Sequence, residues 1–265
     1  MITPGLGEKG KRLAVVILAA GRGKRLGGKN QKVVHDLMGR PLLSYLLPTV
    51  KSLFPERIII VVGFKKEQIF SWIHDAAVEY VEQPEPKGTG HAVACTEKIL
   101  GSYRGNILVL CGDVPFLSQH TLLKMINLHQ EEGNVATVLT TIMEKPTGYG
   151  RILRNGSDVI AIVEEINATP EQRAIKEINA GVYLFRSVEL FQTLPEVLPD
   201  PRKGEQYLTD VVGLLAVKGY RVGSYQTACP EEVLGINTED DLRKAEQWLK
   251  ERKVRLNQEV VEKQS

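Results

Sequence analysis

The residues Leu13-Ala-Val-Val-Ile-Leu-Ala-Ala-Gly-Arg-Gly-Lys-Arg25 decide the fold, because an apolar run here leads directly into a glycine-rich, basic loop. A continuous apolar run bounded by glycine and charge is typical of a strand that is buried on both faces, as in a parallel sheet. Gly21 and Gly23 would let backbone amides approach a ligand closely, which is how proteins cradle phosphate oxygens. By itself, the loop is explained equally well as a glycine turn beside a solvated basic surface.

Strand-like and helical patterns alternate after this segment. The strand-like runs lie at 57–62, 78–81 and 106–110, and the helical patterns at 41–53, 65–74 and 90–100 and from Ser118 onward. This order predicts a doubly wound α/β fold with a mostly parallel sheet. Ser118 is the expected N-cap of its helix.

The pattern changes after Asn134 to strands joined by turns, at 135–142, 151–153, 159–163 and 180–185. We expect these to add antiparallel strands over one side of a pocket. A helix at 207–218, a strand at 221–225 and a helix at 238–252 that opens on Thr238 complete the pattern. One large domain over residues 13–252 is therefore predicted, with a flexible lead-in at 1–12 and a polar tail at 253–265 that frays.

Composition excludes several classes of protein. The 34 basic and 32 acidic side chains give a formal charge of +2, which is too balanced for a general nucleic-acid or membrane surface. The three cysteines are widely spaced and predict neither a disulfide framework nor a structural zinc site. Basic residues before Leu13 are compatible with a short signal peptide, but the glycine-rich continuation favours a strand and loop. No run reaches the roughly 18 to 20 apolar residues of a membrane span, so a cytoplasmic enzyme is expected.

The loop fits neither of two common nucleotide-binding motifs. A dinucleotide fingerprint requires G-x-G-x-x-G and a carboxylate that closes the next strand. Here the spacing is Gly21, Gly23 and Gly27, and the strand at 57–62 is followed by no carboxylate. A Walker-type sequence is also absent. The cations that follow the loop instead suit a triphosphate with a pyrophosphate leaving group, and they are Arg22, Lys24, Arg25, Lys29 and Lys32.

Several segments, taken together and in order, resemble the sugar-nucleotide pyrophosphorylases, and most closely the bacterial N-acetylglucosamine-1-phosphate uridylyltransferases. The matching segments are Leu18-Ala-Ala-Gly-x-Gly-x-Arg25 with Lys32, Gly88-Thr-Gly-His-Ala92, Gly112-Asp-Val-Pro115, Thr147-Gly-Tyr-Gly-Arg-Ile152, Glu177-Ile-Asn-Ala-Gly181, Gly204-Glu-x-Tyr-Leu-Thr-Asp210 and Gly235-Ile-Asn237. The resemblance covers about residues 13 to 250. It implies a Rossmann-like doubly wound mixed sheet of the nucleotide-diphospho-sugar transferase type. It also implies UTP and N-acetylglucosamine 1-phosphate as substrates, Mg²⁺ as cofactor, and UDP-N-acetylglucosamine and pyrophosphate as products.

The resemblance assigns roles to individual residues. The catalytic residues would be Arg25 and Lys32, and Asp113 and Asn237 would hold the metal. The nucleotide would lie against Leu18, Ala19, Ala20, Gly21, Gly23, Gln83, Gly88 and Thr89. The sugar would be held by Gly150, Glu164, Asn179 and Asn237, with Tyr207 and Thr209 shaping the pocket wall. Independently of the resemblance, Asp113 follows a buried strand, where a carboxylate is a natural ligand for Mg²⁺ but also a common turn residue.

Two residues depart from the family pattern. Gln31 precedes Lys32 where proline is frequent, and Cys111 precedes Gly112 where an aromatic residue is frequent in close relatives. Another sugar 1-phosphate or nucleoside triphosphate therefore remains an alternative, as do a non-catalytic sugar-nucleotide sensor and, more distantly, an oxidoreductase. Many relatives continue into an acetyltransferase β-helix, which this sequence is expected to lack. The oligomeric state stays open.

Overall fold

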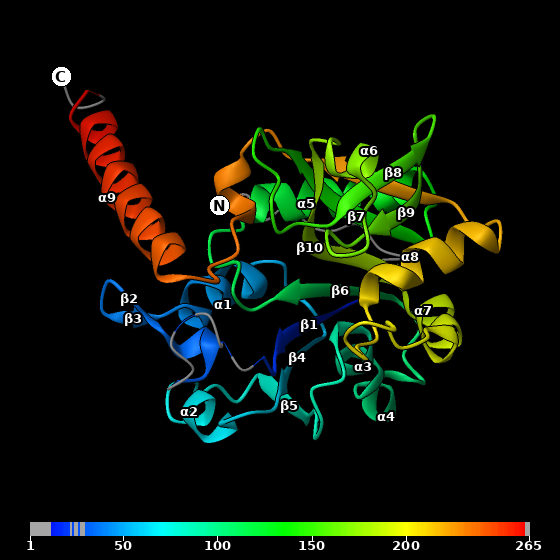
Figure 1. Cartoon of the computed structure of the whole chain (residues 1–265). Coiled ribbons are helices and arrows are strands. Elements are labelled where there is room, and N and C mark those ends of the chain that lie inside the picture. The colour runs from blue at the N-terminus through cyan, green and yellow to red at the C-terminus, as the bar shows by residue number, and fades with distance from the viewer. Residues whose placement is uncertain (1–11, 22, 24–25, 27–29, 263–265) are drawn as a thin grey trace.

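Strand β1 (Leu13–Ala19) lies in the middle of a mixed sheet (Figure 1). The structure is a computed structural model that describes residues 12–21, 23, 26 and 30–262, with the side chains of its last helix described to Glu251. The expected lead-in therefore lies almost wholly outside the described residues, as do the expected phosphate-binding cations Arg22, Lys24, Arg25 and Lys29.

The strands of the sheet follow the order β11-β7-β10-β6-β1-β4-β5. β1 pairs in parallel with β4 (Arg57–Val62) and β6 (Asn106–Cys111), and β4 pairs in parallel with β5 (Val78–Glu82). These four strands confirm the parallel half that the alternating pattern predicted. β1, β4 and β6 are buried along most of their length, whereas β5, at the edge of the sheet, is buried only at Val78 and Val81.

The second half of the chain adds the antiparallel part. β10 (Glu177–Arg186) runs antiparallel to both β6 and β7 (Ala136–Ile142), while β11 (Val222–Gln226) is parallel to β7. The hairpin of β8 (Arg151–Asn155) and β9 (Asp158–Val163) joins the sheet through β10. The predicted Rossmann-like, doubly wound mixed sheet is therefore confirmed.

Helices cover both faces of the sheet, and β1 shows why. Its side chains alternate, so that Ala14 and Val16 join one core cluster while Val15 and Ile17 join the other. The first cluster is closed by α3 (Thr89–Ala94), α4 (Glu97–Leu100), α7 (Ser187–Thr193) and α8 (Leu208–Val217). The second is closed by α1 (Leu43–Lys51), α2 (Lys66–Phe70) and α5 (Gln119–Glu131). Each fully buried aliphatic side chain contributes about 1.5–3 kcal/mol relative to exposure.

Several helix boundaries differ from the predictions. The expected helix at 90–100 is two helices, because the buried Thr96 hydroxyl donates to the Val93 carbonyl at 2.7 Å and competes with the helical ladder. The helix expected from residue 41 starts at Leu43, and Pro41 belongs to a short hairpin of β2 (Asp36–Leu37) and β3 (Arg40–Pro41). The helix expected at 65–74 spans only α2.

The end of the chain also corrects the prediction. The last helix, α9 (Glu239–Glu262), continues ten residues beyond the expected end at Arg252, so most of the tail that was expected to fray is helical. It extends away from the body of the molecule (Figure 1). The short helix α6 (Pro170–Arg173) was missed, although Thr169 and Gln172 form a capping box and Pro170 opens it. None of the described helices is long and apolar enough to cross a membrane.

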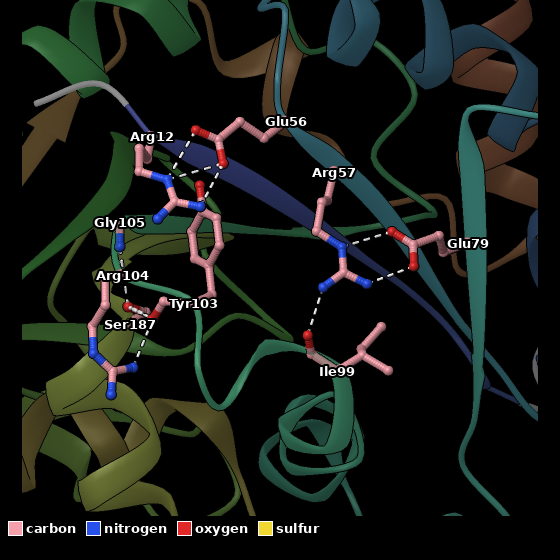
Figure 2. A network of polar contacts seen from close by, with 9 residues as sticks. All are labelled: Arg12, Glu56, Arg57, Glu79, Ile99, Tyr103, Arg104, Gly105 and Ser187. Carbon is pink, nitrogen blue, oxygen red and sulfur yellow. Dashed lines mark hydrogen bonds and ion pairs between the residues drawn. The ribbon is translucent and has the colours of Figure 1, made fainter.

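Ion pairs cluster at the amino ends of the parallel strands, as Figure 2 shows. The Arg12 guanidinium donates to the Glu56 carboxylate at 3.0 Å, and Arg57 donates to Glu79 at 2.7 Å and to the Ile99 carbonyl at 2.5 Å. These groups satisfy one another at the strand starts. Exposed pairs of this kind add little stability. At this end of the strands, the charges of Arg12 and Arg57 are thus neutralised by carboxylates of the same chain.

Candidate functional site

A cavity of about 550 Å³ lies at the carboxyl ends of the parallel strands, the edge where open α/β sheets bind ligands. It is bounded by the end of β1 and its loop, the segment after β5, the start of α3 and the end of β6. The predicted site residues that line it are Leu18, Ala19, Ala20, Gly21, Gly23, Lys32, Gln83, Gly88, Thr89 and Asp113, together with Tyr207. Arg25, the other predicted catalytic residue, lies outside the described residues.

Lys32, Asp113 and Asn237 meet beside this cavity. The Lys32 ammonium forms an ion pair with the Asp113 carboxylate and donates to the Asn237 side-chain oxygen at 2.7 Å. Only 15% of the Lys32 side chain and 17% of the Asp113 side chain is exposed, so water screens the pair only partly. Lys32 comes from a short 3₁₀ helix (Lys32–Val34), Asp113 from the turn after β6, and Asn237 from the segment before α9.

Backbone contacts fix Asn237 next to Asp113. The Ile236 amide donates to the Asp113 carbonyl at 2.9 Å, and the Asn237 amide donates to the Asp241 carboxylate at 3.0 Å. The same carboxylate accepts from the Thr238 amide, while the Thr238 hydroxyl accepts from the Asp241 amide at 3.1 Å. The helix start that the sequence predicted at Thr238 therefore holds a candidate metal ligand in place.

The donor set at this point fits a divalent cation. Oxygen atoms of Asp113 and Asn237 already converge on one cation, the Lys32 ammonium. Mg²⁺ takes oxygen ligands and usually retains several waters, with one or two protein groups and substrate phosphates completing its shell. Among the described residues, no group of three or more His, Cys, Asp or Glu side chains could hold a metal by itself. A two-oxygen site that needs phosphate to complete it suits Mg²⁺.

The wall of the cavity formed by Gln83 and Gly88 is tightly packed. Gln83 is only 6% exposed, and its amide nitrogen donates to the Gly88 carbonyl at 3.0 Å and lies 3.0 Å from His91 Nδ1. Gly88 has a φ of +101°, and a Cβ there would lie 2.4 Å from the Gln206 carbonyl oxygen. Glycine is therefore required, because both the backbone conformation and the contact exclude a side chain.

Thr89 and Gly90 link this wall to the start of α8 and to the residues just before it. Its hydroxyl oxygen accepts from the Leu208 amide at 2.9 Å, and the Gly90 amide donates to the Gln206 carbonyl at 2.8 Å. Thr209, the residue after Leu208, donates its hydroxyl to the Glu164 carboxylate at 3.0 Å. One segment thus contacts both the candidate nucleotide wall and a candidate sugar ligand.

The other predicted sugar ligands lie together but do not line the 550 Å³ cavity. The Asn179 amide donates to the Gly150 carbonyl at 2.9 Å, and the Asn179 side chain donates to the Tyr183 hydroxyl at 2.6 Å. Burial raises the pKa of Glu164, and the bond from Thr209 partly opposes that shift. These residues belong to β10 and the region around the β8–β9 hairpin.

Cys111 stands between the two groups. It lines the cavity, and its Sγ lies 3.1 Å from where a Cβ would stand on Gly181 in β10. Burial raises the pKa of its thiol to about 12, so the thiol is neutral. A small uncharged side chain therefore separates the cavity from the Asn179 side of the site.

Sequence reasoning did not give Gln31 or Glu205 a place in the site. Both line the cavity, and Gln31 is fully buried. Glu205 lies in the quoted Gly204–Asp210 segment, so its position beside a predicted pocket residue was a signal that could have found it. Gln31 was noticed only as a departure beside Lys32, because hydrogen bonds to distant backbone atoms leave no pattern in a sequence.

A family model described as nucleotidyl transferase matches residues 14–229. Among curated relatives, the Bifunctional protein GlmU of Bacillus licheniformis is 42% identical over 243 residues, which cover 91% of this chain and 53% of the relative. The protein of the same name from Streptomyces avermitilis is 43% identical over 244 residues, covering 90% and 51%. The chain thus spans about half the length of the curated relatives it matches.

Solved structures share the fold. A UDP-glucose pyrophosphorylase complexed with UDP-glucose superposes with a TM-score of 0.73 at 21% identity, over 91% of this chain and 99% of that one. The apo form of a UDP-glucose pyrophosphorylase gives the same TM-score at 20% identity, with the same coverage. At this identity, the likeness concerns the arrangement of the sheet and helices.

Proposed function

The chain belongs to the nucleotidyl transferase family, and on that premise we propose that it transfers a uridylyl group from UTP to N-acetylglucosamine 1-phosphate, with Mg²⁺, and releases pyrophosphate. The observation that carries the proposal is the meeting of Lys32, Asp113 and Asn237 beside the glycine-rich end of β1. The choice of these substrates rests on the motifs that extend from Leu18 to Asn237.

Charge neutralisation and positioning are enough for this chemistry, because the attacking group is a phosphate oxygen that needs no strong base. In the proposed complex, the Lys32 ammonium exchanges its two oxygen partners for phosphate oxygens of the substrates. Arg25 is proposed to hold the leaving pyrophosphate. Asp113 and Asn237 would hold Mg²⁺, which when bound neutralises negative charge on the phosphate oxygens.

The remaining predicted residues select the two substrates. We assign the nucleotide to the surface formed by Leu18, Ala19, Ala20, Gly21, Gly23, Gln83, Gly88 and Thr89. The Gln83 Nε2 already contacts the Gly88 carbonyl and His91, so the group that Gln83 offers to a uracil edge is its side-chain oxygen, as an acceptor for the ring N–H. We assign the sugar to Gly150, Glu164, Asn179 and Asn237. Backbone amide, carboxylate and carboxamide groups together match the donors and acceptors of an N-acetylhexosamine.

The experiment that tests substrate choice is a matrix of nucleoside triphosphates against sugar 1-phosphates, with Mg²⁺, read by pyrophosphate release. UTP with N-acetylglucosamine 1-phosphate should give the highest kcat/KM. A faster reaction with another pair would replace the substrates and keep the reaction type. Tight binding of a sugar nucleotide without any turnover would favour the non-catalytic sensor.

Two variants test the metal ligands. Asp113→Ala and Asn237→Ala should each lower kcat by about 10²-fold or more, because charge stabilisation in the transition state is lost. Asp158→Ala is the matched control, since Asp158 is an exposed aspartate on β9 and should leave turnover unchanged. Near-normal turnover by Asp113→Ala in saturating Mg²⁺ would remove Asp113 from the metal site.

A further inference from the structure

We propose that Gln31 is a positioning residue that clamps the start of the glycine-rich loop to the segment carrying Lys32. The inference rests on the proposed function, because it concerns how the candidate catalytic lysine is held. Gln31 is 0% exposed, which is unusual for glutamine, and it lines the cavity. A polar side chain that is wholly buried must have its amide satisfied, and this one is satisfied by backbone groups on both sides of the loop.

Both ends of the Gln31 carboxamide are engaged. Its Nε2 donates to the Ala19 carbonyl and lies 3.4 Å from the Gly21 carbonyl, so one NH₂ group faces two carbonyls where β1 passes into the loop. Its Oε1 accepts from the Val33 amide at 2.6 Å. The side chain therefore bridges the residues before the loop and the residues after it.

A second contact fixes Gln31 from outside the loop. Its backbone amide donates to the Gln68 side chain of α2 at 2.7 Å. Both chain neighbours of Lys32 are therefore held. Gln31 is bonded to β1 and to α2, and the Val33 amide is bonded to the Gln31 side chain. Because the backbone is held on both sides of Lys32, the position of its ammonium depends mainly on the rotamers of the lysine side chain.

Gly23 approaches the backbone of Lys32 closely. A Cβ on Gly23, which has a φ of +57°, would lie 3.0 Å from the Lys32 Cβ. Gly23, one of the described residues of the loop, therefore lies against the lysine that Gln31 positions. Because Gln31, Lys32 and Val33 all line the cavity, a shift of the 31–33 segment would move part of the cavity lining together with the ammonium.

Two substitutions separate positioning from packing. Gln31→Met keeps length and volume but removes the donor and the acceptor, and it should lower kcat by roughly 10- to 100-fold through misplacement of the lysine. Gln31→Glu is the more discriminating variant. A protonated carboxyl can donate to the Ala19 carbonyl and accept from Val33, whereas a carboxylate can only accept and would face that carbonyl.

The pH profile then reports the clamp. Burial raises the pKa of a carboxyl group, so the ratio of Gln31→Glu turnover to wild-type turnover should be highest at low pH and fall as the carboxyl ionises. The ratio for Gln31→Met should stay low at every pH. A flat ratio for Gln31→Glu, or wild-type kcat in Gln31→Met, would overturn the proposal.

The control is Gln119→Met, because Gln119 also donates to a backbone carbonyl, Ser52, at 2.8 Å but on the surface. It should leave turnover unchanged. A readout that needs no turnover is the hydrogen exchange of the Val33 amide, which should lose its protection in Gln31→Met and keep it in Gln119→Met. An inactive wild type would refute the proposed function, while retained Val33 protection in Gln31→Met would refute the clamp.

Discussion

Gly88→Ala is the substitution whose effect the structure defines most sharply. Gly88 has a φ of +101° and a ψ of 177°, a region that is essentially restricted to glycine. The added Cβ would lie 2.4 Å from the Gln206 oxygen and 2.8 Å from the Gln206 nitrogen. These are backbone atoms, so no side chain can rotate away to relieve the contact.

The cost combines backbone strain with lost hydrogen bonds. Holding alanine in this conformation costs about 1–3 kcal/mol. Moving Gln206 aside would break the bonds from Gln206 N to Lys87 O and from Gly90 N to Gln206 O, each with a net value of about 0.5–1.5 kcal/mol. The free energy of unfolding should therefore fall by roughly 2–6 kcal/mol, which lowers Tm by about 5–20 °C in a domain of this size.

Thermal and urea unfolding measure this loss, with Gly156→Ala as the control. Gly156 also has a positive φ, of +60°, but an added Cβ there meets nothing within 4 Å. Its variant should lose only the conformational term, about 1–2 kcal/mol. Equal destabilisation of the two variants would show that Gln206 yields freely, and the rigid link between the 87–90 and 206–208 segments would then be wrong.

Two further predictions concern buried titratable groups. Burial raises the pKa of Glu164, so its contribution to the free energy of unfolding is fully present at low pH and is lost as pH rises through the raised pKa. Glu164→Gln should therefore have a higher Tm than the wild type at pH 7.5 and no such advantage at low pH. The same variant should bind the sugar phosphate more weakly, as measured by calorimetry. Burial lowers the pKa of His129 to about 4. The contribution of neutral His129 to the free energy of unfolding is therefore complete above the pKa of the unfolded chain, about 6.5, and falls by up to about 3 kcal/mol as the pH drops to about 4. Urea unfolding of wild type and His129→Gln should show a smaller loss between pH 7 and pH 4.5 in the variant, and parallel losses would contradict this reasoning.

The parallel strands could be predicted because their signal is local. β1, β4 and β6 are buried on both faces, which produces continuous apolar runs with glycine or charge at their ends. The break between α3 and α4 could not be predicted in the same way. It depends on a hydroxyl-to-carbonyl bond of Thr96, a residue type that helices also tolerate.

The candidate site also contains one residue with a local sequence signal and others without one. Asp113 was identifiable as a strand-end carboxylate, but Lys32 and Asn237 stand 81 residues before and 124 residues after it, as follows from the 81- and 205-residue separations of the two Lys32 contacts. Nothing local relates such distant residues, so only the family resemblance placed them together. Gln31 was noticed as a departure, but its bridging role could not be foreseen, because its partners are backbone atoms of the loop.

The charged side chains at the two ends of the parallel strands differ in exposure and surroundings, and this difference bears on the anion binding that we propose for a nearly neutral chain. At the amino edge, the side chains of Arg12 and Glu56 are 55% and 42% exposed, and the hollow beside Arg12 measures only about 20 Å³. Such pairs are screened by salt and water. At the carboxyl edge, Lys32 and Asp113 are less exposed and border about 550 Å³ of open space. A cation there acts over a short, poorly screened distance, so the formal charge of +2 for the whole chain sets no limit on anion binding at the cavity.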